Sequence, residues 1–128
     1  MKEKEILNLL KKTIKNSYSP YSHYKVAAVI ETKSGKLYSG VNVENASFGL
    51  TLCAERVAAA CAIKDGKKDF KRIYVMTEDD EPQIPCGACL QFLAEFNPDL
   101  EIVSFGKKSK KTTILSKVLS SAFYFHKK

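Results

Sequence analysis

The chain has 128 residues, 45% of them hydrophobic, which is enough for one hydrophobic core but not for two, so we expect a single domain over residues 1–128. No apolar run reaches the roughly 20 residues that a membrane-spanning helix needs, and the charged residues 1–5 do not lead into a signal peptide. We therefore expect a cytoplasmic protein without membrane contact, whose four cysteines favour metal ligation over disulfides.

The formal charge of +7 raises the question of a nucleic-acid partner, because basic surfaces attract polyanions. The excess lies in residues 107–128, which hold seven lysines and no acidic residue, whereas the rest of the chain has 14 basic and 14 acidic residues. A lysine run of this kind is usually a solvated surface that keeps a protein soluble. We therefore do not expect nucleic acid as a partner.

Hydrophobic periodicity predicts alternating helices and strands along the chain. Apolar residues three and four positions apart indicate helices, and short apolar runs beside turn residues indicate strands. In chain order we predict a helix over residues 3–16, strands over 26–30 and 37–43, a helix over 53–64, a strand over 72–77, a helix over 87–96, a strand over 101–105 and a helix over 113–119. This order implies an α/β fold, in which a mixed sheet has helices on both faces.

The predicted hairpin and the helix over residues 53–64 bear on the position of a binding site. Residues 33–36 read as the turn of a hairpin, so Tyr24 before the first strand and Asn42 at the end of the second meet at one end of the sheet. The helix over residues 53–64 is rich in small residues and apolar on most sides. We therefore expect it to be covered on several faces, with Cys61 buried as a small apolar residue.

Three cysteines are placed as ligands for one metal ion. Cys86 and Cys89 lie about one helical turn apart, and their soft thiolates suit zinc, with Cys53 as the third ligand. Cys61 would lie about 12 Å from Cys53 along one helix, too far to share an ion. The histidines at positions 23 and 126 have no ligand-like spacing to the cysteines. Because a catalytic zinc usually keeps three protein ligands and a structural one four, the sequence predicts an open, catalytic site.

The two residues that follow Cys53 and Ala54 complete this predicted site. Glu55 can stand beside the ion without coordinating it, and a carboxylate in that place can move protons. Three thiolates leave a zinc site with net negative charge, which weakens the metal as a Lewis acid. The dipoles of the two helices and the guanidinium of Arg56 can offset that charge.

Four motifs stand in order along the chain. They are Ser19-Pro20-Tyr21-Ser22-His23-Tyr24-Lys25-Val26-Ala27-Ala28, Gly40-Val41-Asn42-Val43-Glu44-Asn45-Ala46, Cys53-Ala54-Glu55-Arg56 and Pro85-Cys86-Gly87-Ala88-Cys89. With them the chain resembles the small homotetrameric zinc-dependent cytidine deaminases over nearly its whole length. The resemblance implies a three-layer α/β/α sandwich with a central mixed sheet of about five strands. It also implies hydrolytic deamination of cytidine and deoxycytidine in pyrimidine salvage, with one Zn²⁺ per chain and Glu55 as the catalytic proton carrier.

The same resemblance implies substrate-binding residues. Asn42 and Glu44 match the positions that bind the sugar hydroxyls, and the main-chain amide of Ala54 matches the donor to the base carbonyl. Tyr24 stands where the family usually has a phenylalanine against the pyrimidine ring. Phe123 matches an aromatic residue contributed by a neighbouring subunit, although the proline usual shortly before it is absent here. The resemblance thus implies a homotetramer with active sites shared between subunits.

Two alternatives remain open on the sequence. A deaminase of another aminopyrimidine nucleoside, such as the blasticidin type, shares the fold and the zinc motifs. A zinc-stabilised nucleic-acid-binding module would use the lysine-rich segment and would bind polynucleotides in a strongly salt-dependent way. The second alternative leaves Glu55 and the open coordination position without a purpose.

Overall fold

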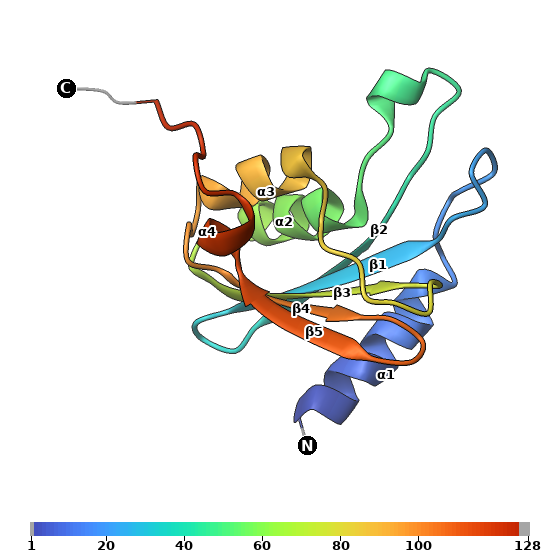
Figure 1. The fold of residues 1–128 in the computed structure, drawn as a ribbon, viewed down its shortest axis with the longest axis horizontal. Helices are drawn as coiled ribbons and strands as arrows, with labels where there is room; N and C mark the ends of the chain where they lie inside the picture. Colours follow the sequence, from blue (N-terminus) through green and yellow to red (C-terminus); the bar gives the residue numbers. More distant parts are fainter. Residues whose placement is uncertain (1, 126–128) are drawn as a thin grey trace.

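The structure is a computed structural model that describes residues 2–125. One five-stranded sheet, in the order β2-β1-β3-β4-β5, forms the middle of the molecule (Figure 1). Its strands are β1 Val26–Thr32, β2 Leu37–Val41, β3 Phe70–Thr77, β4 Glu101–Phe105 and β5 Lys110–Ile114. β3 and β4 pair in parallel and the other neighbours pair antiparallel, so the sheet is mixed, as predicted.

Helices cover both faces of this sheet, which confirms the predicted α/β/α sandwich (Figure 1). The helices are α1 Lys2–Ile14, the 3₁₀ helix η1 Phe48–Leu50, α2 Ala54–Lys64, α3 Gly87–Ala94 and α4 Leu115–Val118. α1 lies on one face of the sheet, and α2, α3 and α4 lie on the other. Among the described residues, no helix combines the length and the hydropathy that crossing a membrane requires.

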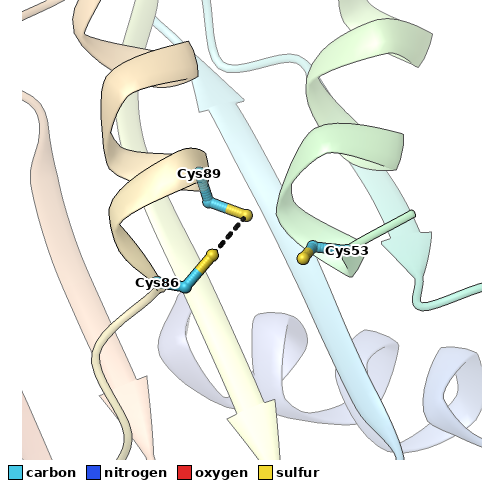
Figure 2. A group of neighbouring side chains, drawn as sticks. All are labelled: Cys53, Cys86 and Cys89. Atoms are coloured by element: carbon cyan, nitrogen blue, oxygen red, sulfur yellow. Dashed lines mark hydrogen bonds between the residues drawn. The ribbon is translucent and has the colours of Figure 1, made fainter. Parts of the chain in front are cut away.

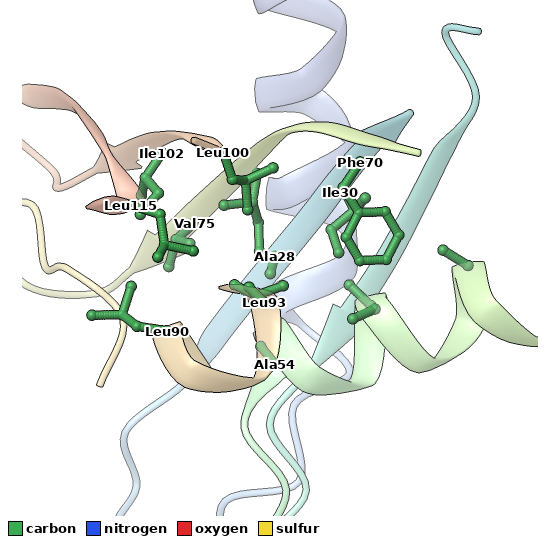
Figure 3. Close-up of a cluster of buried hydrophobic side chains, with 14 of the residues drawn as sticks. Ala28, Ile30, Ala54, Phe70, Val75, Leu90, Leu93, Leu100, Ile102 and Leu115 are labelled. Atoms are coloured by element: carbon green, nitrogen blue, oxygen red, sulfur yellow. The ribbon is translucent and has the colours of Figure 1, made fainter. Parts of the chain in front are cut away.

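The larger hydrophobic core lies between the sheet and the helices α2 and α3 (Figure 3). Successive residues of β1 point to opposite faces, so Ala28 and Ile30 belong to this core while Ala27 and Val29 pack with α1. The alternation explains why β1 reads as an uninterrupted apolar run in the sequence. On this face of the sheet α2 and α3 lie side by side, and both helices begin at the same end (Figure 1).

The fifth strand, β5, is absent from the elements that periodicity predicts. It lies in the lysine-rich segment, and most of its side chains are exposed, so no apolar alternation marks it. β5 pairs with β4 from Glu101 opposite Ile114 to Phe105 opposite Lys110. Lysines on such an edge strand discourage pairing with the edge of another sheet. The predicted helix over residues 113–119 is correspondingly shorter, because β5 occupies its first residues.

Helix α2 is covered by the sheet on one side only in this chain, and the expectation that Cys61 is buried is wrong. Its buried residues are Ala54, Glu55, Ala58, Ala59 and Ala62. Cys61 and Ala60 are exposed on the opposite side. Alanine suits both environments, so a helix this rich in alanine does not reveal which side meets the core. The uncovered side borders a hollow of about 390 Å³ that Leu52 and Phe92 also line.

Gly40 lets β2 lie directly against α2. A Cβ added at Gly40 would lie 2.5 Å from the backbone nitrogen of Ala58 and 2.7 Å from the carbonyl oxygen of Ala54. We expect Gly40→Ala to lower the free energy of unfolding by about 1–3 kcal/mol, because α2 must move away from the sheet. Urea denaturation measures this change. Gly49→Ala is the control, since a Cβ there meets nothing within 4 Å, and equal midpoints for the two variants would contradict the prediction.

A buried carboxylate ties α1 to the sheet. Glu31 is 1% exposed, and it accepts hydrogen bonds from Lys2 and, at 3.0 Å, from Nη1 of Arg72. Burial would raise the pKa of Glu31, but the hydrogen bond and charge of Lys2, together with Tyr74 and Arg72, outweigh it and hold the pKa below its ordinary value. The ionised form of Glu31 therefore stabilises the fold.

We expect Glu31→Gln to lower the free energy of unfolding by about 1–3 kcal/mol at pH 7, since Arg72 and Lys2 lose the charge they pair with and both remain partly exposed. The folded-state pKa is lowered, so this stabilisation is present above the unfolded pKa of about 4.3 and is lost as the pH falls through the folded pKa. Urea unfolding at a series of pH values should show the gap between the two proteins shrinking below pH about 4. A gap that is constant with pH would refute the prediction.

Candidate active site

The three predicted zinc ligands come together where α2 and α3 begin, with their sulfurs turned toward one another (Figure 2). The Sγ atoms of Cys53, Cys86 and Cys89 all lie within 4.8 Å of one another, and those of Cys86 and Cys89 are 3.7 Å apart. Sulfurs bound at about 2.3 Å to one tetrahedral zinc ion would lie roughly 3.8 Å apart, so the cluster fits Zn²⁺ with little movement. Within residues 2–125, no histidine, aspartate or glutamate joins this group. Three soft sulfurs are the donor set expected of an open zinc site.

The local backbone explains why these cysteines favour the thiolate form. Cys53 and Cys86 are the residues immediately before α2 and α3, and the N-terminus of a helix carries positive partial charge. A hydrogen bond from the Cys89 thiol, followed by the hydrogen bond and charge of Arg56, lowers the pKa of Cys53 to about 5 against the opposing effect of burial. Cys89 itself is buried in the first turn of α3.

Arg56 stands next to the sulfur cluster, as the sequence predicts. Its Nη2 donates a hydrogen bond to Cys53 Sγ at 3.5 Å. Its Nε is buried and has no hydrogen-bond partner in the described chain. The guanidinium therefore brings one positive charge to the edge of a cluster that becomes negative when its thiols ionise.

Glu55 occupies the first turn of α2 and is only 6% exposed. Burial, and then the charge of Cys53, raise the pKa of Glu55 to about 7. A cation held by the cysteines would act in the opposite direction. A carboxyl group in this environment can both accept and release a proton near neutral pH, which is what a general acid and base must do.

Glu55, Cys53 and Cys86 line one cavity of about 330 Å³ between β1, β3 and the starts of α2 and α3. Its size is within the range of pockets that bind small molecules. It is lined by Tyr24, Val26, Asn42, Thr51, Leu52, Cys53, Ala54, Glu55, Val75, Thr77, Gln83, Ile84, Pro85 and Cys86. The cavity thus joins apolar walls to a proton-transfer group and to two of the three predicted metal ligands.

Comparison with known proteins places this site in a family. The model of the cytidine and deoxycytidylate deaminase zinc-binding region matches residues 1–105. The chain belongs to this deaminase family. The family's zinc-binding region and the three-cysteine cluster together identify the cofactor as Zn²⁺.

Individual relatives agree with this assignment to the deaminase family. The chain is 49% identical over 88 residues to a probable cytidine deaminase of Dictyostelium discoideum, with 68% of this chain and 59% of that protein aligned. It is 37% identical over 115 residues to a cytidine deaminase of Sporosarcina psychrophila, with 88% and 85% aligned. The crystal structure of a cytidine deaminase from Burkholderia pseudomallei matches with a TM-score of 0.90 and 38% identity, covering 96% of this chain and 100% of that one. The aligned part therefore spans less than two thirds of the Dictyostelium protein but the whole Burkholderia chain.

Asn42 lines the cavity of about 330 Å³, but most of its hydrogen-bonding capacity is already used. Its Nδ2 donates to the carbonyl oxygen of Tyr24 at 2.8 Å, and its Oδ1 accepts from the backbone nitrogen of Val26 at 3.0 Å and from Ser17. One amide hydrogen remains for a ligand. Asn42 thereby fixes the end of the β1–β2 hairpin as well as lining the cavity.

Glu44 is not among the residues that line this cavity. Its carboxylate accepts hydrogen bonds from the backbone nitrogens of Tyr21 and Ser22, at 3.0 and 3.1 Å, and from the Ser22 hydroxyl. It borders a second cavity of about 400 Å³, and Thr51 lines both cavities. The structure therefore places Glu44 next to the cavity that Glu55 lines, and the contact of Glu44 with a sugar stays a prediction.

Phe123 lies outside the chain's own cavity. It is 69% exposed, and its backbone nitrogen and oxygen are held by the side chain of Gln91 at 2.9 and 2.7 Å. Phe123 does not line the chain's own cavity, and its role in the site of another copy stays a prediction. Of the two histidines excluded as ligands, His23 is exposed and outside the cysteine group, and His126 lies outside the described residues.

Several cavity residues escape the sequence analysis. Gln83 and Ile84 line the cavity from the loop between β3 and α3, and Thr77 lines it from the last position of β3. Their one sequence signal is position, because a loop that leads into Cys86, a predicted metal ligand, passes beside the predicted metal site. The residue types alone, two of them polar and one apolar, carry no signal of their own.

Proposed function

We propose that this protein catalyses the zinc-dependent hydrolytic deamination of cytidine and deoxycytidine to uridine and deoxyuridine, with release of ammonia. The observation that carries the proposal is the buried carboxyl group of Glu55 in one cavity with a cluster of thiol ligands. Cys53, Cys86 and Cys89 would hold the zinc. When bound, zinc supplies a Lewis acid that makes water nucleophilic near neutral pH.

Glu55 is the proton carrier of this reaction. Its carboxylate accepts a proton from the attacking water and delivers it to N3 of the cytosine ring. It then accepts the remaining proton of the hydroxyl group formed on C4 and passes it to the amino group that leaves from C4. The water oxygen remains on C4 as the carbonyl of uracil, and the amine departs as ammonia. One group can serve at each stage because burial raises its pKa toward neutral pH, while the charge of a bound metal ion would act in the opposite direction.

Residues of the same cavity orient the pyrimidine. Ala54 is the first residue of α2, so its amide belongs to the N–H groups that have no partner inside the helix and can donate to the base carbonyl. Tyr24 supplies an aromatic face against the ring. The apolar side chains of Val26, Val75 and Ile84 exclude bulk water from the cavity, which strengthens the electrostatic interactions inside it.

We assign the sugar to Asn42 and Glu44. Asn42 lines the cavity and has one amide hydrogen without a partner in the described part of the chain. A nucleoside whose base lies beside Glu55 extends its sugar past Thr51 toward Glu44, which exchanges its bonds to Ser22 for bonds to the sugar hydroxyls. A site that depends on such bonds discriminates against ligands without the hydroxyls, because buried polar groups would stay unpaired.

A direct assay tests the proposal. The zinc-loaded protein is mixed with cytidine, deoxycytidine, deoxycytidine monophosphate and blasticidin S, and loss of absorbance and release of ammonia are followed for each. Turnover of cytidine and deoxycytidine is the expected result. Turnover of blasticidin S without turnover of cytidine would replace the proposal with the blasticidin-type alternative.

We further propose a homotetramer with subunit-shared active sites. The proposal is supported by large apolar side chains that this chain leaves exposed, among them Phe48 at 74%, Leu50 at 66% and Phe123 at 69%. The uncovered side of α2 adds to this surface. Light scattering on the 14.3 kDa chain should give four times the monomer mass, and a monomer would refute the assembly.

We also propose that residues 1–128 form one cytidine deaminase-like domain that acts on free nucleosides in cytoplasmic pyrimidine salvage. The charges of the lysine-rich segment are partly paired, Lys110 with Glu3 and Lys108 with Asp80, which argues against a dedicated polyanion surface. Nucleic acid should therefore bind weakly. Tight, salt-dependent binding of a polynucleotide would contradict this part of the proposal.

A further inference from the structure

The hydroxyl group of Tyr24 has no part in stacking against a base, yet it makes a specific contact. It donates a hydrogen bond to Oδ2 of Asp79 at 2.7 Å. The backbone of Tyr24 is held separately, because its carbonyl accepts from Asn42 and its nitrogen donates to Ser22 Oγ at 3.0 Å. The hydroxyl therefore restrains the orientation of the Tyr24 ring.

Asp79 is well placed to restrain a neighbour because its own backbone is fixed on two sides. Its nitrogen donates to Thr77 Oγ1 at 3.2 Å, at the end of β3. Its carbonyl accepts from the backbone nitrogen of Lys107 at 2.8 Å, in the turn between β4 and β5. This turn and the loop after β3 are in close contact, because a Cβ added at Gly106 would lie 2.3 Å from the carbonyl oxygen of Asp80.

We propose that Asp79 is a positioning residue that sets the ring of Tyr24 against the pyrimidine of a bound nucleoside. Tyr24 lines the cavity and Asp79 does not, so Asp79 acts on a substrate through Tyr24. The inference rests on the proposed function, because it needs a planar base in that cavity. Burial and the hydrogen bond to Asp79 raise the pKa of Tyr24, so the hydroxyl remains a donor at neutral pH.

A positioning role predicts a particular kinetic pattern. A ring already held in its bound orientation loses less side-chain entropy when the base arrives, so binding is tighter. The stacking contact is made equally in the ground state and the transition state, and such uniform binding changes KM and not kcat. A defect in folding or in zinc binding would lower kcat instead.

The test is a double-mutant cycle on the zinc-loaded enzyme with cytidine as substrate. Asp79→Ala should raise KM about 3- to 10-fold and leave kcat within about twofold, the loss expected for one exposed hydrogen bond to a charged group. Asp79→Asn keeps an acceptor oxygen and should restore KM to within about twofold of wild type. Tyr24→Phe should raise KM to a similar extent, and adding Asp79→Ala to it should have no further effect.

Asp80→Ala is the matched control. It removes the same charge from the next residue, whose carboxylate pairs with the exposed Lys108 at 3.7 Å, and it should leave KM unchanged. An unchanged KM in Asp79→Ala, additive effects with Tyr24→Phe, or an equal rise in Asp80→Ala would overturn the inference. Wild-type enzyme without cytidine turnover would refute the proposed function itself, whereas normal turnover with an insensitive Asp79→Ala variant refutes the positioning role alone.

Discussion

Glu55→Gln is expected to keep its zinc and its fold while kcat for cytidine falls about 10²- to 10⁴-fold, the usual contribution of a general acid and base. Glutamine has nearly the shape of the glutamate it replaces, so the buried first turn of α2 should not rearrange. It can neither accept nor release a proton, so every proton transfer assigned to Glu55 loses its carrier. Steady-state kinetics measures the loss, and metal analysis measures the zinc.

Glu95→Gln is the control for this change, because Glu95 is exposed at the end of α3 and does not line the cavity. It should retain wild-type kcat and zinc content. A Glu55→Gln enzyme that kept more than about a tenth of the wild-type kcat would show that another group moves the protons. A variant that lost zinc as well would show that Glu55 helps to hold the metal.

The sequence could predict the zinc cluster because the constraint is local. Cys86 and Cys89 are brought together by one helical turn, and Cys53 joins them because both cysteine stretches follow strands of one sheet and begin helices. The buried strands and helices could also be predicted, because apolar periodicity indicates which side of an element faces a core. β5 could not be predicted, because an exposed edge strand leaves no such pattern.

The surroundings of several residues could not be predicted from the sequence, because they depend on distant parts of the chain. Cys61 is exposed because one side of α2 faces away from the sheet, and alanine-rich sequence does not record that side. Glu44 is turned toward the backbone of Tyr21 and Ser22 by a loop conformation that no motif encodes. The contact between Tyr24 and Asp79 joins residues 55 positions apart, so only the folded structure reveals it.

Cys86→Ala is expected to remove the metal and with it nearly all activity. Two sulfurs cannot hold zinc as three do, and the loss of even an outer partner of a zinc ligand typically weakens metal binding about 10- to 100-fold. Cys86 is the informative ligand to change because it is exposed, so its truncation leaves the core intact, whereas Cys89 is fully buried. Metal analysis after dialysis should give well below one zinc per chain.

Cys61→Ala is the matched control for the loss of a thiol. Cys61 is exposed on α2 and lies outside the sulfur cluster, so its removal should leave one zinc per chain and wild-type kcat. Circular dichroism of both variants separates loss of metal from loss of fold. If Cys86→Ala kept a full complement of zinc and normal turnover, the three-sulfur site would not be the metal centre, and the zinc ligands would have to be sought elsewhere in the chain or its assembly.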